Sequence, residues 1–163
     1  MKKSLQTRIA QTMAILLLTS FTLSGCKKDK TDEPISQIKK ATIQLSGAQE
    51  VPAVNTSGTG TAEISYDPAM KMITYKITWQ LGSASATTTN MHFHVSDTGS
   101  DTVSSGVALA ITGFSTGNSG TLNGVTVALT SVQEAQLLAG KWYVNIHSST
   151  YGSGELRGNI KFQ

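Results

Sequence analysis

The stretch Ile73-Thr74-Tyr75-Lys76-Ile77-Thr78-Trp79-Gln80-Leu81 decides the fold class, because every second residue in it is apolar. Successive side chains of a strand point to opposite faces of a sheet, so the pattern predicts one face in the core and one in water. Such alternation is typical of antiparallel sheets. Shorter runs of the same kind lie at residues 43–45, 61–66, 91–95, 107–111, 125–129, 143–146 and 156–162.

Turn-forming residues separate these runs, for example at Tyr66-Asp67-Pro68, Gly117-Asn118 and Asn123-Gly124. Residues 41–163 are enough for one hydrophobic core and too few for two. About seven to nine short strands joined by such turns predict an all-β domain, a Greek-key antiparallel β-sandwich or barrel.

One segment departs from the alternating pattern and has helical spacing instead. Apolar residues recur through residues 132–139, and Gly140 follows them as a stop signal. The preceding Ser131-Val132-Gln133-Glu134 has the form of a capping box. The sequence therefore predicts one short helix near residues 131–139, at one end of the sandwich.

The N-terminus predicts export. Lys2, Lys3 and Arg8 precede a short apolar run at residues 9–21, and Leu23-Ser24-Gly25-Cys26 follows. A membrane-spanning helix needs about 20 apolar residues, so this run indicates a cleaved signal peptide at residues 1–25. The tetrapeptide resembles the lipobox of bacterial lipoproteins, which implies diacylglycerol and palmitate-like acyl chains on Cys26. The alternative is an ordinary secretory signal with a chance cysteine.

Residues 26–40 are rich in charge and contain Pro34, and their composition predicts a flexible linker that precedes the domain at residues 41–163. The charges after Cys26 are either a sorting signal or simply a solvated linker. We expect anchoring to the cell envelope, at the outer membrane. Cys26 is the only cysteine of the chain, so the domain folds without disulfides.

The charge balance argues against nucleic acid as a partner. The chain has 13 Lys and Arg against 10 Asp and Glu, but Lys2, Lys3 and Arg8 lie in the signal peptide, and the remainder is neutral overall. The basic residues of the domain form no cluster, whereas nucleic-acid binding needs a basic surface. The expected partners are the membrane, through the N-terminal lipid, and an unidentified protein or envelope ligand.

Five stretches together resemble the CHRD domain, a module named after chordin that also occurs singly in exported bacterial proteins. The resemblance implies a β domain, and chordin's binding of growth factors implies a binding role. The stretches are LSGAQEVPAV at residues 45–54, GTGTAEI at 58–64, MHFHV at 91–95, LTSVQEAQLLAGKWYVNIHSSTYG at 129–152 and GELRGNI at 154–160.

A more distant resemblance concerns metal chemistry. The sequences His92-Phe93-His94-Val95, Asn145-Ile146-His147 and Gly154-Glu155-Leu156-Arg157-Gly158 are similar to the copper-ligand and arginine segments of copper-zinc superoxide dismutases. That family also has a Greek-key barrel. The chain departs from it by lacking a fourth histidine, a recognisable zinc loop and the paired cysteines. The resemblance implies copper or zinc as cofactor.

Strand alternation predicts where these side chains point. His92 and His94 share a face on the wet side of their strand, while Phe93 faces the core. The same alternation, called strand parity below, predicts that six residues of the two later strands face outward: Tyr143, Asn145, His147, Glu155, Arg157 and Asn159. Three imidazoles on one face can hold an ion at about 2.0–2.1 Å and leave a fourth position open.

Glu155 would then orient an imidazole, and Arg157 would attract a small anion. The alternative is three exposed histidines bonded to polar neighbours, with Glu155 and Arg157 as a surface ion pair. The chain has no phosphate loop or dinucleotide fingerprint. The leading hypothesis is therefore a lipid-anchored binding or envelope-structural module without catalytic activity. The second is a metalloprotein that handles copper or superoxide through His92, His94 and His147.

Overall fold

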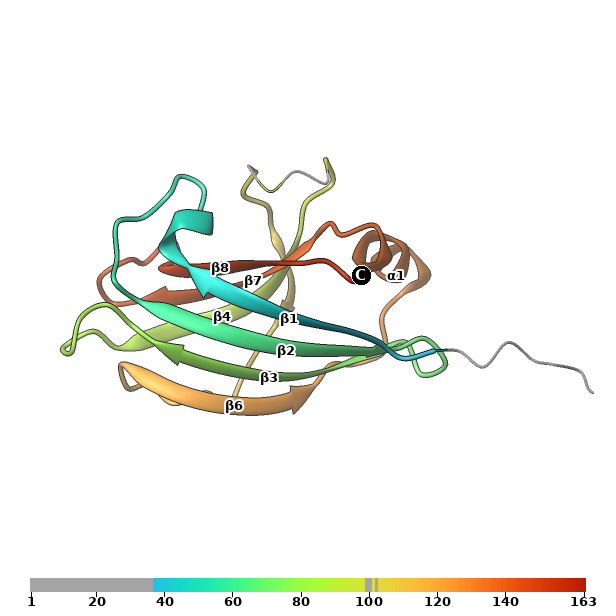
Figure 1. The fold of residues 1–163 in the computed structure, drawn as a ribbon, viewed down its shortest axis with the longest axis horizontal. Coiled ribbons are helices and arrows are strands. Elements are labelled where there is room, and N and C mark those ends of the chain that lie inside the picture. The colour runs from blue at the N-terminus through green and yellow to red at the C-terminus, as the bar shows by residue number, and fades with distance from the viewer. Residues whose placement is uncertain (1–36, 99–100, 102) are drawn as a thin grey trace, which may run out of the picture. The chain divides into compact units, whose positions relative to one another are not determined.

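The computed structural model describes residues 37–98, 101 and 103–163, and these form one sheet of eight antiparallel strands with one α-helix (Figure 1). The all-β prediction is confirmed. The segment predicted to be a signal peptide, Cys26 and residues 27–36 lie outside the described residues. The elements are β1 (Lys39–Ser46), η1 (Gly47–Gln49), β2 (Thr59–Asp67), β3 (Met72–Gln80), β4 (Thr88–Val95), β5 (Val107–Ala110), β6 (Ser119–Val125), α1 (Ser131–Leu138), β7 (Trp142–Ser148) and β8 (Leu156–Ile160). Strand β1 thus includes Lys39 and Lys40, which the sequence assigned to the linker.

The strand order is β5-β4-β7-β8-β1-β2-β3-β6, so the first and last strands of the chain are neighbours. The sheet is strongly curled (Figure 1). Four strands separate β3 from β4 in this order, yet the rings of Tyr75 and Phe93 on these strands lie only 5.4 Å apart. Trp79 Nε1 donates a hydrogen bond of 2.8 Å to Thr88 Oγ1, which donates one of 2.8 Å to the Gly117 carbonyl. These bonds join the two ends of the curl.

The inner side of the curl holds the apolar core. On β3, Ile73 and Ile77 are fully buried while Thr74 and Lys76 are exposed, as the alternation predicts. Burial of such side chains contributes about 1.5–3 kcal/mol each. The largest fully buried apolar side chains are Leu45, Ile64, Tyr66, Ile73, Ile77, Met91, Phe93, Leu137, Trp142, Ile146 and Leu156.

Strand β6 lies earlier than predicted. The turn expected at Asn123-Gly124 is wrong, because this pair lies inside β6, and the strand ends at Val125 instead of continuing to residue 129. The glycines of β6 serve close packing. A Cβ on Gly120 would lie 2.6 Å from Trp79 Cη2, and one on Gly124 would lie 2.3 Å from the Tyr75 hydroxyl. Both positions therefore need glycine inside a strand.

Helix α1 is confirmed, but its N-cap is Thr130, one residue before the predicted Ser131. Thr130 Oγ1 accepts from the Gln133 amide at 3.2 Å, and Gln133 Oε1 accepts from the Thr130 amide at 3.0 Å. Glu134 is consequently free to accept a hydrogen bond of 2.6 Å from the Tyr66 hydroxyl, which ties the helix to β2. None of the helices in the described part of the chain is long and apolar enough to cross a bilayer.

Candidate functional site

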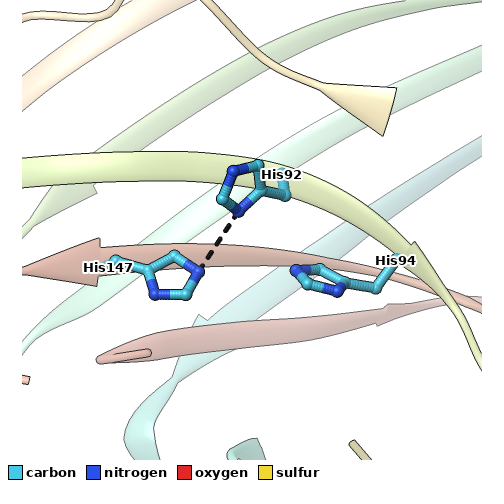
Figure 2. A group of neighbouring side chains, drawn as sticks. All are labelled: His92, His94 and His147. Atoms are coloured by element: carbon cyan, nitrogen blue, oxygen red, sulfur yellow. Dashed lines mark hydrogen bonds between the residues drawn. The ribbon is translucent and has the colours of Figure 1, made fainter. Parts of the chain in front are cut away.

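The outer face of strands β4, β7 and β8 carries the three histidines. His92 and His94 project from β4 and His147 from β7, and Figure 2 shows their rings converging on one small space. One ligand nitrogen from each residue lies within 4.8 Å of the other two. The structure thus brings together the three residues that strand parity placed on one face.

The ring nitrogens face one another at close range. His92 Nδ1 lies 3.3 Å from His147 Nε2, and the centroids of these two rings are 5.1 Å apart. The His94 ring lies 5.5 Å from that of His92 and 6.5 Å from that of His147, between centroids. A nitrogen of His94 points toward the gap between the other two rings (Figure 2).

Backbone carbonyls fix the tautomers of two of these rings. His94 Nδ1 donates to the Ser105 carbonyl and His147 Nδ1 donates to the Gly152 carbonyl, both at 2.9 Å. A carbonyl can only accept, so the proton of each neutral ring is on Nδ1 and the lone pair is on Nε2. His94 Nε2 is buried and has no hydrogen-bond partner among the described residues.

Burial favours the uncharged forms of His92 and His94. Desolvation lowers the pKa of His94 below 6.5, as do nearby His92 and His147, whereas backbone hydrogen bonds at Ser105 and Gly106 oppose this effect. Desolvation also lowers the pKa of His92, and His147 adds to the shift. Both rings are therefore neutral near pH 7 and keep a lone pair available.

The prediction that this face lies in water is wrong. His92 and His147 are half-buried, but His94 is only 8% exposed, and Glu155 and Arg157 are 1% exposed. Two segments cover the face, the 47–57 loop and the Val103–Gly106 segment (Figure 1). Strand parity predicts the side of a sheet on which a residue lies, but not whether a distant segment covers that side.

The 47–57 loop is held by buried carboxylates. Glu50 Oε1 accepts from Asn145 Nδ2 at 2.5 Å, and Glu155 Oε1 accepts from Thr56 Oγ1 at 2.8 Å and from the Gly82 amide at 2.7 Å. Glu155 therefore fastens loops and does not orient an imidazole as predicted. That role belongs to the carbonyls of Ser105 and Gly152, which carry no signal in the sequence.

Glu50 is itself unusual, because it is buried beside polar groups of the sheet. Desolvation raises the pKa of Glu50 to about 7, although the charge of Arg157 and the Val51 amide both act to lower it. The loop is thus attached through a carboxyl group that titrates near neutral pH.

The Val103–Gly106 segment is held by the same strands. The Ser105 amide donates to the Tyr143 hydroxyl at 3.0 Å, and Arg157 Nη2 donates to the Val103 carbonyl at 3.1 Å. Ser104 Oγ donates to the Val51 carbonyl at 2.7 Å and so joins the two covering segments. Strand alternation placed Tyr143 on the same face as His147, but no motif in the sequence marks it as a site residue.

Tyr143 separates Arg157 from the histidines. The His94 ring stacks on Tyr143 at 4.8 Å between centroids with an interplanar angle of 3°, and the Arg157 guanidinium lies 3.5 Å from the Tyr143 centroid. Because β7 lies between β4 and β8, His94 and Arg157 occupy opposite faces of the tyrosine ring. Arg157 is therefore badly placed to attract an anion to the histidines.

The alternative of a surface ion pair between Glu155 and Arg157 is wrong too. Both residues are buried, and the ion pairs found within the described residues join other side chains. Those pairs are Lys71 with Glu134, Lys76 with Glu63 and Lys161 with Asp101.

Comparison with known proteins identifies one family. The family model described as the CHRD domain matches residues 41–160, which include the three histidines, Tyr143 and Arg157. No curated protein matches the chain, and no solved structure does.

Proposed function

The chain belongs to the CHRD domain family, and on that premise we propose that it is an exported lipoprotein whose β domain binds a ligand at the cell envelope. The sequence Leu23-Ser24-Gly25-Cys26, directly after a short apolar run, is the observation that carries the location. Lipid on Cys26 would hold the chain to the membrane, and two or more acyl chains make such anchoring durable.

The binding site in this proposal is the histidine cluster, reached from the exposed parts of His92 and His147. These two rings are half-exposed, and they lead to the buried ring of His94. His94 and His147 are already fixed by hydrogen bonds to the Ser105 and Gly152 carbonyls, so little ordering is needed when a ligand enters. A small, preformed, polar site of this kind favours a small ligand.

A dismutase function has weaker support than binding. The likeness to superoxide dismutases implied that Arg157 guides an anion and that Glu155 orients a ligand. Tyr143 lies between Arg157 and His94, and Glu155 accepts from Thr56 instead. The proposal therefore includes binding at the histidines and no turnover of superoxide.

Fractionation of bacteria that produce the full chain tests the location. Wild-type protein should lie in the membrane fraction and incorporate a palmitate label, while Cys26→Ser should remain unlabelled and leave the membrane. Ser24→Ala is the matched control, because it keeps a small residue in the tetrapeptide and should behave as wild type. A Cys26→Ser protein that fractionates with membranes as wild type does would refute the anchor.

A further inference from the structure

We infer that His92 Nδ1, His94 Nε2 and His147 Nε2 form a binding site for one divalent transition-metal ion of the copper or zinc class. The inference rests on the proposed function, since it names the ligand class of the same histidine cluster. All three histidines of the chain take part.

The spacing of the nitrogens fits such an ion. Two ligands that are each about 2.0–2.1 Å from a tetrahedral metal lie roughly 3.3–3.4 Å from each other. His92 Nδ1 and His147 Nε2 are 3.3 Å apart, across a hydrogen bond that His92 Nδ1 donates. The His92 proton therefore moves to its own Nε2 when Nδ1 becomes a ligand. The His94 nitrogen lies within 4.8 Å of both, so a ring movement on the order of 1 Å completes a three-coordinate set.

The hydrogen bonds prepare the rings to act as ligands. The Ser105 and Gly152 carbonyls hold the Nδ1 protons of His94 and His147 on the far side of each ring, so that both Nε2 lone pairs point into the cluster. A carbonyl acceptor on the outer N–H is the usual partner of a metal-bound histidine. A buried lone pair without a donor is unfavourable, and His94 Nε2 is such an atom among the described residues. A cation would satisfy it.

The chemistry of the ligands selects the class of metal. Calcium and magnesium require oxygen ligands, and no carboxylate belongs to this cluster in the part of the chain that the structure describes. Neutral imidazoles suit zinc and copper. Three protein ligands leave a fourth position, which faces the half-exposed side of His92 and His147 and can hold water.

Metal titration of the full chain tests the inference. The chain, which carries a histidine-free tag, is purified in detergent from whole-cell lysate and stripped with chelator. It is then titrated with Cu²⁺ or Zn²⁺ against a competing chelator. We expect one ion per chain by elemental analysis, and Cu²⁺ electron paramagnetic resonance that shows nitrogen ligands. His92→Ala and His147→Ala should each weaken binding at least about 100-fold, beyond the range typical of outer-shell changes.

Asn90→Ala is the matched control, because Asn90 is exposed on β4 opposite His147 and is not part of the ligand set. It should keep wild-type affinity. Circular dichroism and the melting temperature establish that each variant is folded, and His147→Gln provides a milder variant if an alanine unfolds the chain. The inference would be overturned if the folded wild-type protein bound far less than one ion per chain. It would also be overturned if the folded histidine variants bound the ion as tightly as wild type.

The two proposals can fail separately. If the chain carries the palmitate label and lies in the membrane but takes up no metal, the metal site is refuted and the proposal of an exported lipoprotein stands. A chain that binds one ion through its histidines but carries no lipid refutes the anchor and leaves the metal site intact.

Discussion

The guanidinium carbon of Arg157 lies 3.5 Å from the centre of the Tyr143 ring, and this contact buries a cation against an aromatic face. The opposite face of the ring stacks on His94. A desolvated contact between a cation and a ring contributes about 2 kcal/mol. The Tyr143 ring therefore separates the buried arginine from the histidine cluster.

Substitution of Tyr143 should show how much of its contribution to stability comes from the ring and how much from the hydroxyl. Tyr143→Phe keeps the stack and loses the hydrogen bond from the Ser105 amide, so we expect a loss of about 1 kcal/mol in the free energy of unfolding. Tyr143→Ala also removes the ring beside Arg157 and should cost about 3–5 kcal/mol. Urea denaturation of both variants measures the difference. Equal losses would show that the stack contributes little.

Replacement of Glu50 should change how stability depends on pH. The pKa of this carboxyl group is about 7 when folded and close to 4.5 when unfolded, so the folded state binds more protons between these values. The free energy of unfolding should therefore fall as the pH rises from about 4.5 to 7, by about 1–3 kcal/mol. Glu50→Gln should remove this part of the slope. Denaturant midpoints across this pH range test it, with the exposed Glu63→Gln as a charge-matched control.

Addition of a methyl group to β6 should disturb the core. Gly120→Ala places a Cβ against the Trp79 ring, which is buried and fixed by its bond to Thr88, so we expect a loss of about 1–3 kcal/mol. Gly106→Ala is the control, because a Cβ there meets nothing within 4 Å. Thermal unfolding of the two variants should differ clearly. Similar melting temperatures would contradict the close packing of β6 on Trp79.

The N-cap of α1 can be tested by two neighbouring substitutions. Thr130→Ala removes the acceptor of the Gln133 amide and should destabilise the domain by about 1 kcal/mol. Ser131→Ala should have almost no effect, because the Ser131 hydroxyl contacts only the exposed Lys71 amine. Chemical denaturation of the pair decides which residue caps the helix, and a larger loss at Ser131 would reverse the assignment.

The sequence predicts the fold class well because burial on one side of a strand leaves a period of two. This signal is clear in β3, where Ile73 and Ile77 alternate with Thr74 and Lys76. It fails in β6, because Gly120 and Gly124 are selected by contact with aromatic rings on β3, and in the sequence they have the same appearance as turn residues. The cap of α1 is shifted by one residue because Thr130 and Ser131 each begin a stretch with the form of a capping box. In the structure Gln133 closes the box with Thr130, and Glu134 bonds to Tyr66 instead.

The candidate site is predictable in part for the same reason. Parity alone places His92, His94 and His147 on one face, and the structure brings their rings together. It cannot predict that the 47–57 loop and the Val103–Gly106 segment cover this face, since that depends on contacts between residues far apart in the chain. The partners of Glu155 and Arg157 therefore differ from those predicted, because both residues bind the covering segments.

The pairing of β1 with β8 has a consequence for how such a chain is made. Strand β1 finds one neighbour in β2, but its other neighbour consists of residues 156–160, more than a hundred positions further along. Contacts of such large sequence separation form slowly. The sheet therefore cannot close between β1 and β8 until residues 156–160 have been synthesised, so the domain is completed late in the synthesis of the chain.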